Sequence, residues 1–138
     1  MVTTRRMQLN TRGDTDIVDI TPDAARILQE SGLQAGIATV FVAHSTAAVT
    51  VVECESGLLR DVKAMFERLL PQNVNYEHDQ GYHEGNGHAH LRASLLGPSV
   101  TVPFAQGKLM LGTWQQIVVI DFDNRPRSRE VVVQMMGE

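Results

Sequence analysis

Histidine is the residue type best suited to chemistry in this chain, and four of the five histidines lie close together in a polar stretch. These four are His78, His83, His88 and His90, whereas His44 stands apart after an apolar run. A neutral imidazole is the commonest protein ligand for transition metals, and three protein ligands leave a position open for water or substrate. The cluster therefore indicates either a divalent metal site or a set of solvated loop histidines.

The spacing of His88 and His90 limits how many of these side chains can bind one metal. Two histidines at this spacing converge on a strand, whereas on a helix their rings point about 200° apart. Residues 88–96 are typical of a short helix closed by Gly97 and Pro98. On that interpretation only one of the two histidines can face the site.

His44 and Glu53 each follow a short apolar run, so both are expected at strand ends. His44 is either a site residue or a core histidine bonded to the backbone. Glu53 is either a buried carboxylate with a shifted pKa, acting as general acid or base, or an exposed residue beside a helix. Ser45 is a poor nucleophile candidate because adjacent strand side chains point to opposite faces, and no Gly-x-Ser-x-Gly turn surrounds it.

Arg125, Arg127 and Arg129 form an alternating basic row near the end of the sequence. On an extended segment the three guanidinium groups face the same way, which suits a phosphate or a pyrophosphate. The alternative is a solvated edge strand whose charges prevent aggregation. The row makes phosphate binding a hypothesis that the fold must test.

The overall composition argues against several classes of partner. The 138 residues carry a net charge of −4 and have a pI near 5.7, opposite in sign to a typical nucleic-acid or anionic-membrane binder. The single cysteine, Cys54, cannot form an intrachain disulfide or a thiolate zinc site within one chain. No stretch approaches the roughly 18 to 20 apolar residues of a membrane span. We expect one cytoplasmic domain over residues 1–138 that binds neither nucleic acid nor membrane.

Short apolar runs and a few helical periodicities must position these residues. The clearest helix covers residues 58–70, where Pro71 ends the pattern. A second helix starts at Thr21, whose hydroxyl is expected to cap it, and stops at Gly32. Strands are predicted at 5–10, 16–20, 37–43, 47–52, 99–104, 108–114, 115–122 and 127–135.

The order of these elements predicts the fold class. Strands outnumber helices and do not alternate with them. This order favours an α+β fold with a mostly antiparallel, layered, sandwich-like sheet and two to three helices packed on it. Residues 71–87 form a polar loop of about 17 residues, and a loop of that length in a compact domain is usually functional or disordered.

Seven short motifs occur in order along nearly the whole chain. They are HSTAA at 44–48, YEHD at 76–79, GNGHAH at 85–90, SLLGPS at 94–99, GK at 107–108, LGTWQ at 111–115 and the closing segment from Arg129. With these motifs the chain resembles the small YjbQ-like proteins, also described as secondary thiamine-phosphate synthase enzymes. The resemblance implies a sandwich-like subunit that assembles as a homotrimer, a metal-associated histidine site and thiamine-phosphate-synthase-like activity.

The resemblance also implies which residues act at the site. The motif histidines fall on His44, His78 and His90, which would be the three metal ligands. Arg129 matches the family's terminal basic motif better than Arg127 does, and both are expected to bind phosphate.

Three further motif residues, Ser94, Thr113 and Gln115, are expected to bind phosphate as well. Glu53 is kept as the catalytic candidate, although its neighbours Val52 and Cys54 depart from the Asn-Glu-Asn that the family often has.

Three functions are compatible with these residues. The first is a transferase that uses a divalent metal, expected to be zinc, to join a pyrimidine methyl diphosphate to a thiazole phosphate with release of pyrophosphate. The second is a metal-dependent phosphate-ester hydrolase. The third is a trimeric, non-enzymatic protein that binds a metal or a phosphorylated metabolite. An enzyme needs an open metal position, whereas in a binder His83 or His88 would matter as much as His90.

Overall fold

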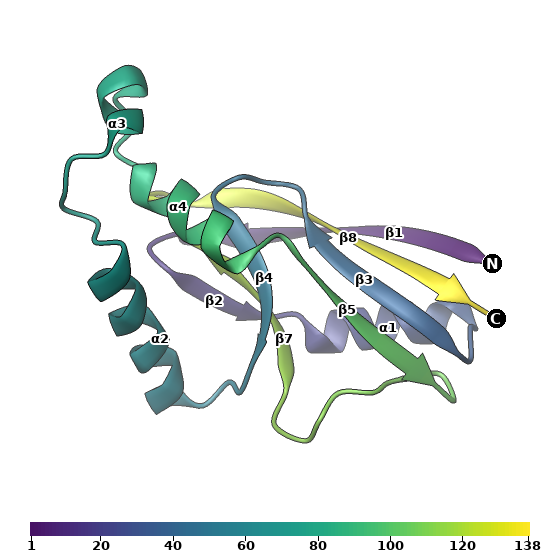
Figure 1. Ribbon diagram of the computed structural model, residues 1–138. Helices are drawn as coiled ribbons and strands as arrows, with labels where there is room; N and C mark the ends of the chain where they lie inside the picture. The colour runs from purple at the N-terminus through teal and green to yellow at the C-terminus, as the bar shows by residue number, and fades with distance from the viewer.

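The computed structural model describes residues 1–138, except for the side chain of Tyr82 (Figure 1). The strands are β1 (Val2–Thr11), β2 (Asp16–Asp19), β3 (Gly36–Val42), β4 (Ala47–Val52), β5 (Ser99–Ala105), β6 (Lys108–Leu109), β7 (Gln116–Asp121) and β8 (Arg127–Gly137). The helices are α1 (Thr21–Ser31), α2 (Ser56–Leu69), α3 (Glu77–Tyr82) and α4 (Gly87–Leu96). None of the helices in the described part of the chain is long and apolar enough to cross a membrane.

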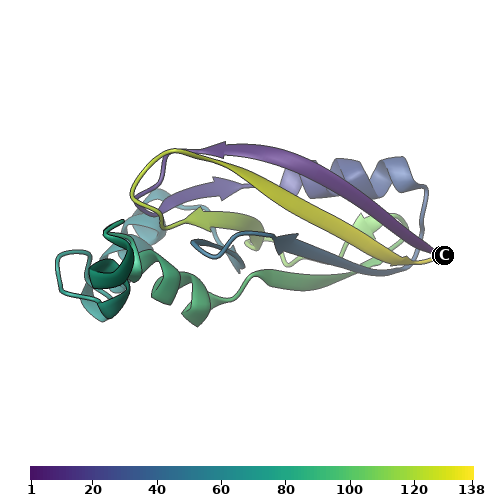
Figure 2. The ribbon, with the colours of Figure 1, turned by 90° about the horizontal axis from the view of Figure 1, so that it is seen from above.

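The strands form two sheets in which all the strand pairs are antiparallel. The five-stranded sheet has the order β1-β8-β3-β5-β6, and the three-stranded sheet has the order β2-β7-β4. Seen from above, β1 and β8 run side by side along the length of the molecule, with α2, α3 and α4 gathered toward one end (Figure 2). The predicted α+β class with layered antiparallel sheets is confirmed.

Strand β7 lies between two hydrophobic clusters, which explains its continuous apolar run. Ile117 and Val119 belong to the cluster shared with the five-stranded sheet and α1. Val118 and Ile120 belong to the second cluster, which lies beneath α2 and α4. A strand that is buried on both faces needs apolar residues at successive positions rather than at alternate ones.

The two predicted long helices are present, but the cap expected for the first is wrong. Thr21 makes no capping bond to α1, because its hydroxyl oxygen accepts a hydrogen bond from the Ile117 amide at 2.8 Å. Helix α1 ends at Gly32, which has a φ of 73° in the left-handed region that favours glycine. Helix α2 is capped by the Glu55 carboxylate and packs Phe66 edge-on against the Phe122 ring.

Two regions differ from the sequence-based predictions. The strand expected at 108–114 has only its first two residues, since Gly112 donates its amide to the Gln115 side chain in an irregular turn. Residues 71–87 contain the short helix α3, which gives four helices instead of two to three. Helix α3 is held by a tertiary contact, because Asp79 accepts the amide hydrogen of Gly87 at 2.8 Å. A helix of this length has too little periodicity to be seen in the sequence.

Candidate functional site

The α3–α4 pair brings two of the predicted ligand histidines together. The ring centroids of His78 on α3 and His90 on α4 lie 4.5 Å apart, with an angle of 56° between the rings. The helical spacing of α4 turns His88 inward, where it is 1% exposed, while His90 is half-buried. Only one member of the His88 and His90 pair faces the site, as their spacing on a helix predicts.

His44 lies after β3 and lines the same cavity as His90. The cavity has a volume of about 200 Å³. It is lined by His44, Ser45, Thr46, Glu84, Asn86, His90, Asp123, Arg127 and Arg129. The structure thus places His44 and His90 on one small polar cavity, with His78 beside His90; we call it the histidine cavity.

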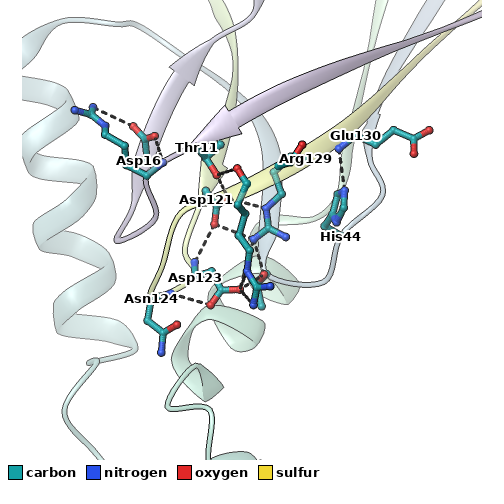
Figure 3. Close-up of polar contacts among 12 residues, drawn as sticks. Thr11, Asp16, His44, Asp121, Asp123, Asn124, Arg129 and Glu130 are labelled. Atoms are coloured by element: carbon teal, nitrogen blue, oxygen red, sulfur yellow. Dashed lines mark hydrogen bonds and ion pairs between the residues drawn. The ribbon is translucent and has the colours of Figure 1, made fainter.

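The His44 ring is held by the backbone of β8. Its Nε2 accepts the amide hydrogen of Glu130 at 2.8 Å (Figure 3). This hydrogen bond assigns the proton of the neutral ring to Nδ1. His44 therefore has to leave the Glu130 amide before one of its nitrogens can bind a metal with the other still protonated.

The cavity keeps its histidines uncharged. Burial lowers the pKa of His44, and the neighbouring Arg129 charge lowers it further. Burial also lowers the pKa of His90, with a second contribution from His78. Both imidazoles are consequently neutral at neutral pH, which is the form that binds metals.

The three histidines are of the right ligand type for a divalent metal, but their side chains do not yet surround one metal position. No group of three or more His, Cys, Asp or Glu side chains among the described residues already surrounds one metal position. The adjacent rings of His78 and His90 suit a shared ion, and imidazole nitrogens suit zinc. His44 lines the same cavity as His90, but its Nε2 is occupied by the Glu130 amide.

A buried ion pair forms one wall of the cavity. Arg129 on β8 binds Asp121 of β7 with two parallel hydrogen bonds, Nε to Oδ2 at 2.6 Å and Nη2 to Oδ1 at 2.9 Å (Figure 3). Nη2 also donates to the Thr46 hydroxyl at 2.6 Å, and Thr11 donates to Asp121. The Arg129 charge is therefore largely neutralised, and its main role is to join β4, β7 and β8 at the cavity.

Asp123 forms the second charged pair, with Arg127. Its Oδ2 accepts Nε of Arg127 at 3.0 Å and the Thr46 hydroxyl at 2.9 Å. Burial on its own would raise the pKa of Asp123, but hydrogen bonds from Asn124, Thr46 and Asn86 outweigh it and hold the pKa below its usual value. Asp123 is thus a carboxylate, and Arg127, whose side chain is 29% exposed, is the arginine of this wall that a ligand can reach.

Sequence reasoning missed Asp121, Asp123 and Asn86. The sequence does hold a signal for the two acids. Asp121 and Asp123 alternate directly before a short turn, and the alternating arginines follow that turn. Acids and bases that alternate on both sides of one turn can pair across it. Asn86 carried no signal outside its motif, since its place in the cavity depends on how α4 begins.

Comparison with known proteins agrees with this fold and these motifs. A model of the family described as UPF0047 protein YjbQ-like matches residues 5–138. The chain belongs to the UPF0047, or YjbQ-like, family. It is 40% identical over 130 residues to a UPF0047 protein of Archaeoglobus fulgidus, covering 94% of this chain and 98% of the relative. It is 35% identical to the UPF0047 protein YugU of Bacillus subtilis, covering 96% and 98%.

Solved structures of UPF0047 relatives share the whole fold. A YbjQ-like protein from Sulfolobus solfataricus has a TM-score of 0.94 and 34% identity, and the match covers 100% of this chain and 99% of that one. A YjbQ/UPF0047 family protein from Clostridium acetobutylicum has a TM-score of 0.88 and 37% identity, over 96% and 99%. The sequence motifs therefore identified the family correctly.

Three of the phosphate-binding residues expected from the UPF0047 resemblance lie outside the histidine cavity. Ser94 is exposed on α4 and does not line it. Thr113 and Gln115 lie just before β7, whereas Asp121 is the last residue of that strand. The six steps from Gln115 to Asp121 span about 20 Å at the rise of an extended strand.

Glu53 lies with Gln115 at the far end of the three-stranded sheet. It directly follows Val52, which pairs with Gln116 at the start of β7. Of the two alternatives for Glu53, the structure supports the exposed residue rather than the buried carboxylate, because Glu53 is exposed where β4 leaves the sheet. One chain therefore brings His44, His78, His90, Arg127 and Arg129 together but holds Glu53, Thr113 and Gln115 apart from them.

Proposed function

We propose that this UPF0047 protein is a metal-associated enzyme that acts on phosphorylated small molecules, with thiamine-phosphate-synthase-like activity. The observation that carries the proposal is the histidine cavity itself, where His44 and His90 face the same small space as Arg127 and Arg129. Imidazoles suit a divalent metal, and guanidinium groups suit phosphate oxygens. Their convergence favours chemistry on a phosphate group bound next to a metal.

His78 and His90 would hold the metal, expected to be zinc, and His44 would complete the set after releasing the Glu130 amide. A bound divalent metal would supply a Lewis acid for a phosphate oxygen or leaving group. The lowered pKa values of His44 and His90 keep both rings neutral at neutral pH, so each ring keeps one unprotonated nitrogen.

Arg127 would neutralise the phosphate of the substrate. Its Nε and Nη2 both contact Oδ2 of Asp123, which orients the guanidinium while leaving Nη1 without a partner among the described residues. Arg129 would contribute chiefly by keeping Thr46 and Asp121 in place beneath the cavity. A phosphate that carries developing charge gains most from donors that are already oriented.

A homotrimer is part of the proposal, and the uncovered face of the five-stranded sheet supports it. On this face a row of apolar side chains crosses four strands, since Met136 pairs with both Val2 and Ile37, and Ile37 pairs with Pro103. Val2, Ile37 and Met136 are between 42% and 57% exposed. Contiguous apolar surface of this kind marks an interaction site. Assembly would also let Glu53, Ser94, Thr113 and Gln115 act at the cavity of a neighbouring subunit.

We further propose a cytoplasmic location. The support is chemical, since the thiol of Cys54 is free and exposed. Exposed unpaired thiols persist in a reducing compartment.

The test is turnover of a pyrimidine methyl diphosphate and a thiazole phosphate by protein purified without a polyhistidine tag. We expect coupled product and pyrophosphate, lost on chelation and in His90→Asn but kept in the matched variant His83→Asn, because His83 is exposed and does not line the cavity. Phosphate release without coupling would instead identify a hydrolase. Saturable binding with no turnover of either kind would contradict an enzyme.

A further inference from the structure

A second polar cavity adjoins the histidine cavity on the far side of Arg127. It has a volume of about 230 Å³. It is lined by Glu84, Asn86, Asn124, Arg125 and Arg127. Glu84, Asn86 and Arg127 line both cavities, so the two spaces are neighbours with a common wall. We call this second space the arginine cavity.

Arg125 is the cation of this cavity that no carboxylate of the described residues neutralises. Its side chain is exposed and makes no hydrogen bond or ion pair with the described residues. Arg127 adds Nη1, which Asp123 does not use. Arg129, two residues further on, is by contrast buried and binds both carboxylate oxygens of Asp121 through Nε and Nη2. Along the alternating row, neutralisation by protein carboxylates falls from Arg129 to Arg125.

The walls of the arginine cavity are joined before any ligand arrives. Asn124 donates its side-chain amide to the Glu84 carbonyl at 2.7 Å, which ties the β7–β8 turn to the segment before α4. The β1–β2 loop packs behind the turn, where Asp14 donates its amide to the Asp123 carbonyl at 2.7 Å. A Cβ at Gly13 would stand 2.6 Å from the same carbonyl oxygen, so this contact requires glycine. Donors held in place by such contacts lose little entropy when a ligand binds.

Asn86 stiffens the wall that the two cavities share. Its side chain is 2% exposed, and its Nδ2 donates to Glu84 and to Asp123 at 3.3 Å each. Those two carboxylates settle which end of the amide is nitrogen. Its Oδ1 is then a buried acceptor with no hydrogen-bond partner among the described residues, in the wall that both cavities share. Such an oxygen needs a donor, such as the hydroxyl of a protonated phosphate or an ordered water.

We propose that the arginine cavity is a second anion subsite, which binds a phosphate group of the substrate between Arg125 and Arg127. The proposal rests on the proposed function, because the histidine cavity would hold the reacting end of the same molecule. The substrate class is then a small molecule with a diphosphate, or with two separate phosphates, that spans both cavities past Arg127.

Glu84 sets the selectivity of this subsite. Its carboxylate faces the same cavity and opposes a lone dianion. A single phosphate therefore binds weakly, whereas a ligand anchored in both cavities gains the full attraction of Arg125. Removing the Arg125 charge should therefore weaken binding of such a ligand, and removing the Glu84 charge should strengthen it.

The test is calorimetric titration of the metal-free full chain with orthophosphate, pyrophosphate and 1,3-propanediol bisphosphate. We expect Arg125→Gln to weaken binding of one of the two probes that carry two phosphate groups about tenfold, the loss of one charge-assisted contact. If the affinity for pyrophosphate depends on Arg125, the substrate carries a diphosphate. If the affinity for the bisphosphate depends on Arg125, the substrate carries two separate phosphates. Glu84→Gln should tighten the same probe.

The matched control is Arg5→Gln, because Arg5 is an exposed arginine on β1 whose side chain hydrogen-bonds to the neighbouring Thr4 carbonyl and lines neither cavity. If Arg125→Gln and Arg5→Gln change affinity equally, or if neither probe with two phosphate groups binds, the subsite is overturned. His90→Asn separates this from the proposed function. If His90→Asn loses turnover but still binds the probe in an Arg125-dependent way, both proposals are supported. If His90→Asn keeps full turnover, the metal enzyme is contradicted and the subsite is not.

Discussion

The two ends of the three-stranded sheet carry the same kinds of residue in very different settings. At the end of β7 where Asp121 pairs with Ala47, charged side chains are buried, paired and turned toward the histidines. At the other end, where Gln116 pairs with Val52, Glu53 and Gln115 are exposed.

The contrast is between polar side chains that burial and pairing hold in fixed positions and polar side chains that are exposed to solvent. Burial makes each electrostatic contact stronger, and it makes an unpaired group costly, so buried charges are held in defined positions. Perturbed and oriented groups of this kind gather at functional sites. The end with the histidine cavity is therefore where we propose the reaction centre, and the other end could contribute to it only from a neighbouring subunit of the proposed trimer.

Removing the Arg129 charge should produce the largest effect. Arg129→Met leaves Asp121 buried without its partner, and we expect a loss of about 3 to 5 kcal/mol in the free energy of unfolding. Urea denaturation measures it, with Arg5→Met as the exposed control. Adding Asp121→Asn to Arg129→Met should restore part of the loss; a double variant no more stable than the single one would contradict the buried pair.

Mixing two inactive variants tests whether the far end acts on a neighbouring subunit. His90→Asn and Gln115→Ala should each be inactive, and an equimolar mixture refolded together should regain about one quarter of the wild-type activity, because each site then draws one intact residue from each of two subunits in a trimer. A mixture no more active than its parents would restrict the site to one chain.

Acidification should destabilise the end with the histidine cavity. Burial lowers the pKa of His88, and the adjacent Arg92 lowers it further; His44 and His90 shift in the same direction. The unfolded chain then binds more protons below the ordinary histidine pKa of 6.5, so the free energy of unfolding falls as the pH falls through that value.

Each of these histidines contributes at most about 1.4 kcal/mol per pH unit. Denaturation of the metal-free protein at pH 7 and at pH 5 measures the change, and NMR titration assigns it to individual rings. Equal or greater stability at pH 5 would be inconsistent with buried neutral histidines.

The smallest effect is expected at the far end. Glu53→Gln should change the free energy of unfolding by less than about 0.5 kcal/mol, because the side chain is exposed. The same denaturation measurement serves, with Arg129→Met as its counterpart. A loss above about 1 kcal/mol would mean that Glu53 is buried in the assembled protein.

The fold could be predicted from sequence where one force dominates. The apolar run of β7 and the amphipathic pattern of α2 reflect burial, which depends on residue type and spacing. The motifs gave the family, and the helical spacing of α4 correctly allowed only one of His88 and His90 to face the cavity.

The parts of the fold and of the site that could not be predicted depend on contacts that the local sequence pattern does not show. Helix α3 is held by the bond between Asp79 and Gly87, and no local pattern announces it. Alternation alone does not tell the three arginines apart, but their burial differs because Arg129 pairs with Asp121 inside the sheets. Sequence placed Glu53 at a strand end without saying which end of the sheet that would be.

The metal content of the protein tests the central claim most directly. Elemental mass spectrometry of tag-free protein should find about one divalent metal ion per subunit, as for an open three-histidine site. The ion should be lost in His90→Asn and retained in His83→Asn. No stoichiometric metal in the wild type, or equal loss in both variants, would contradict the metal site and leave phosphate binding as the function of this end of the molecule.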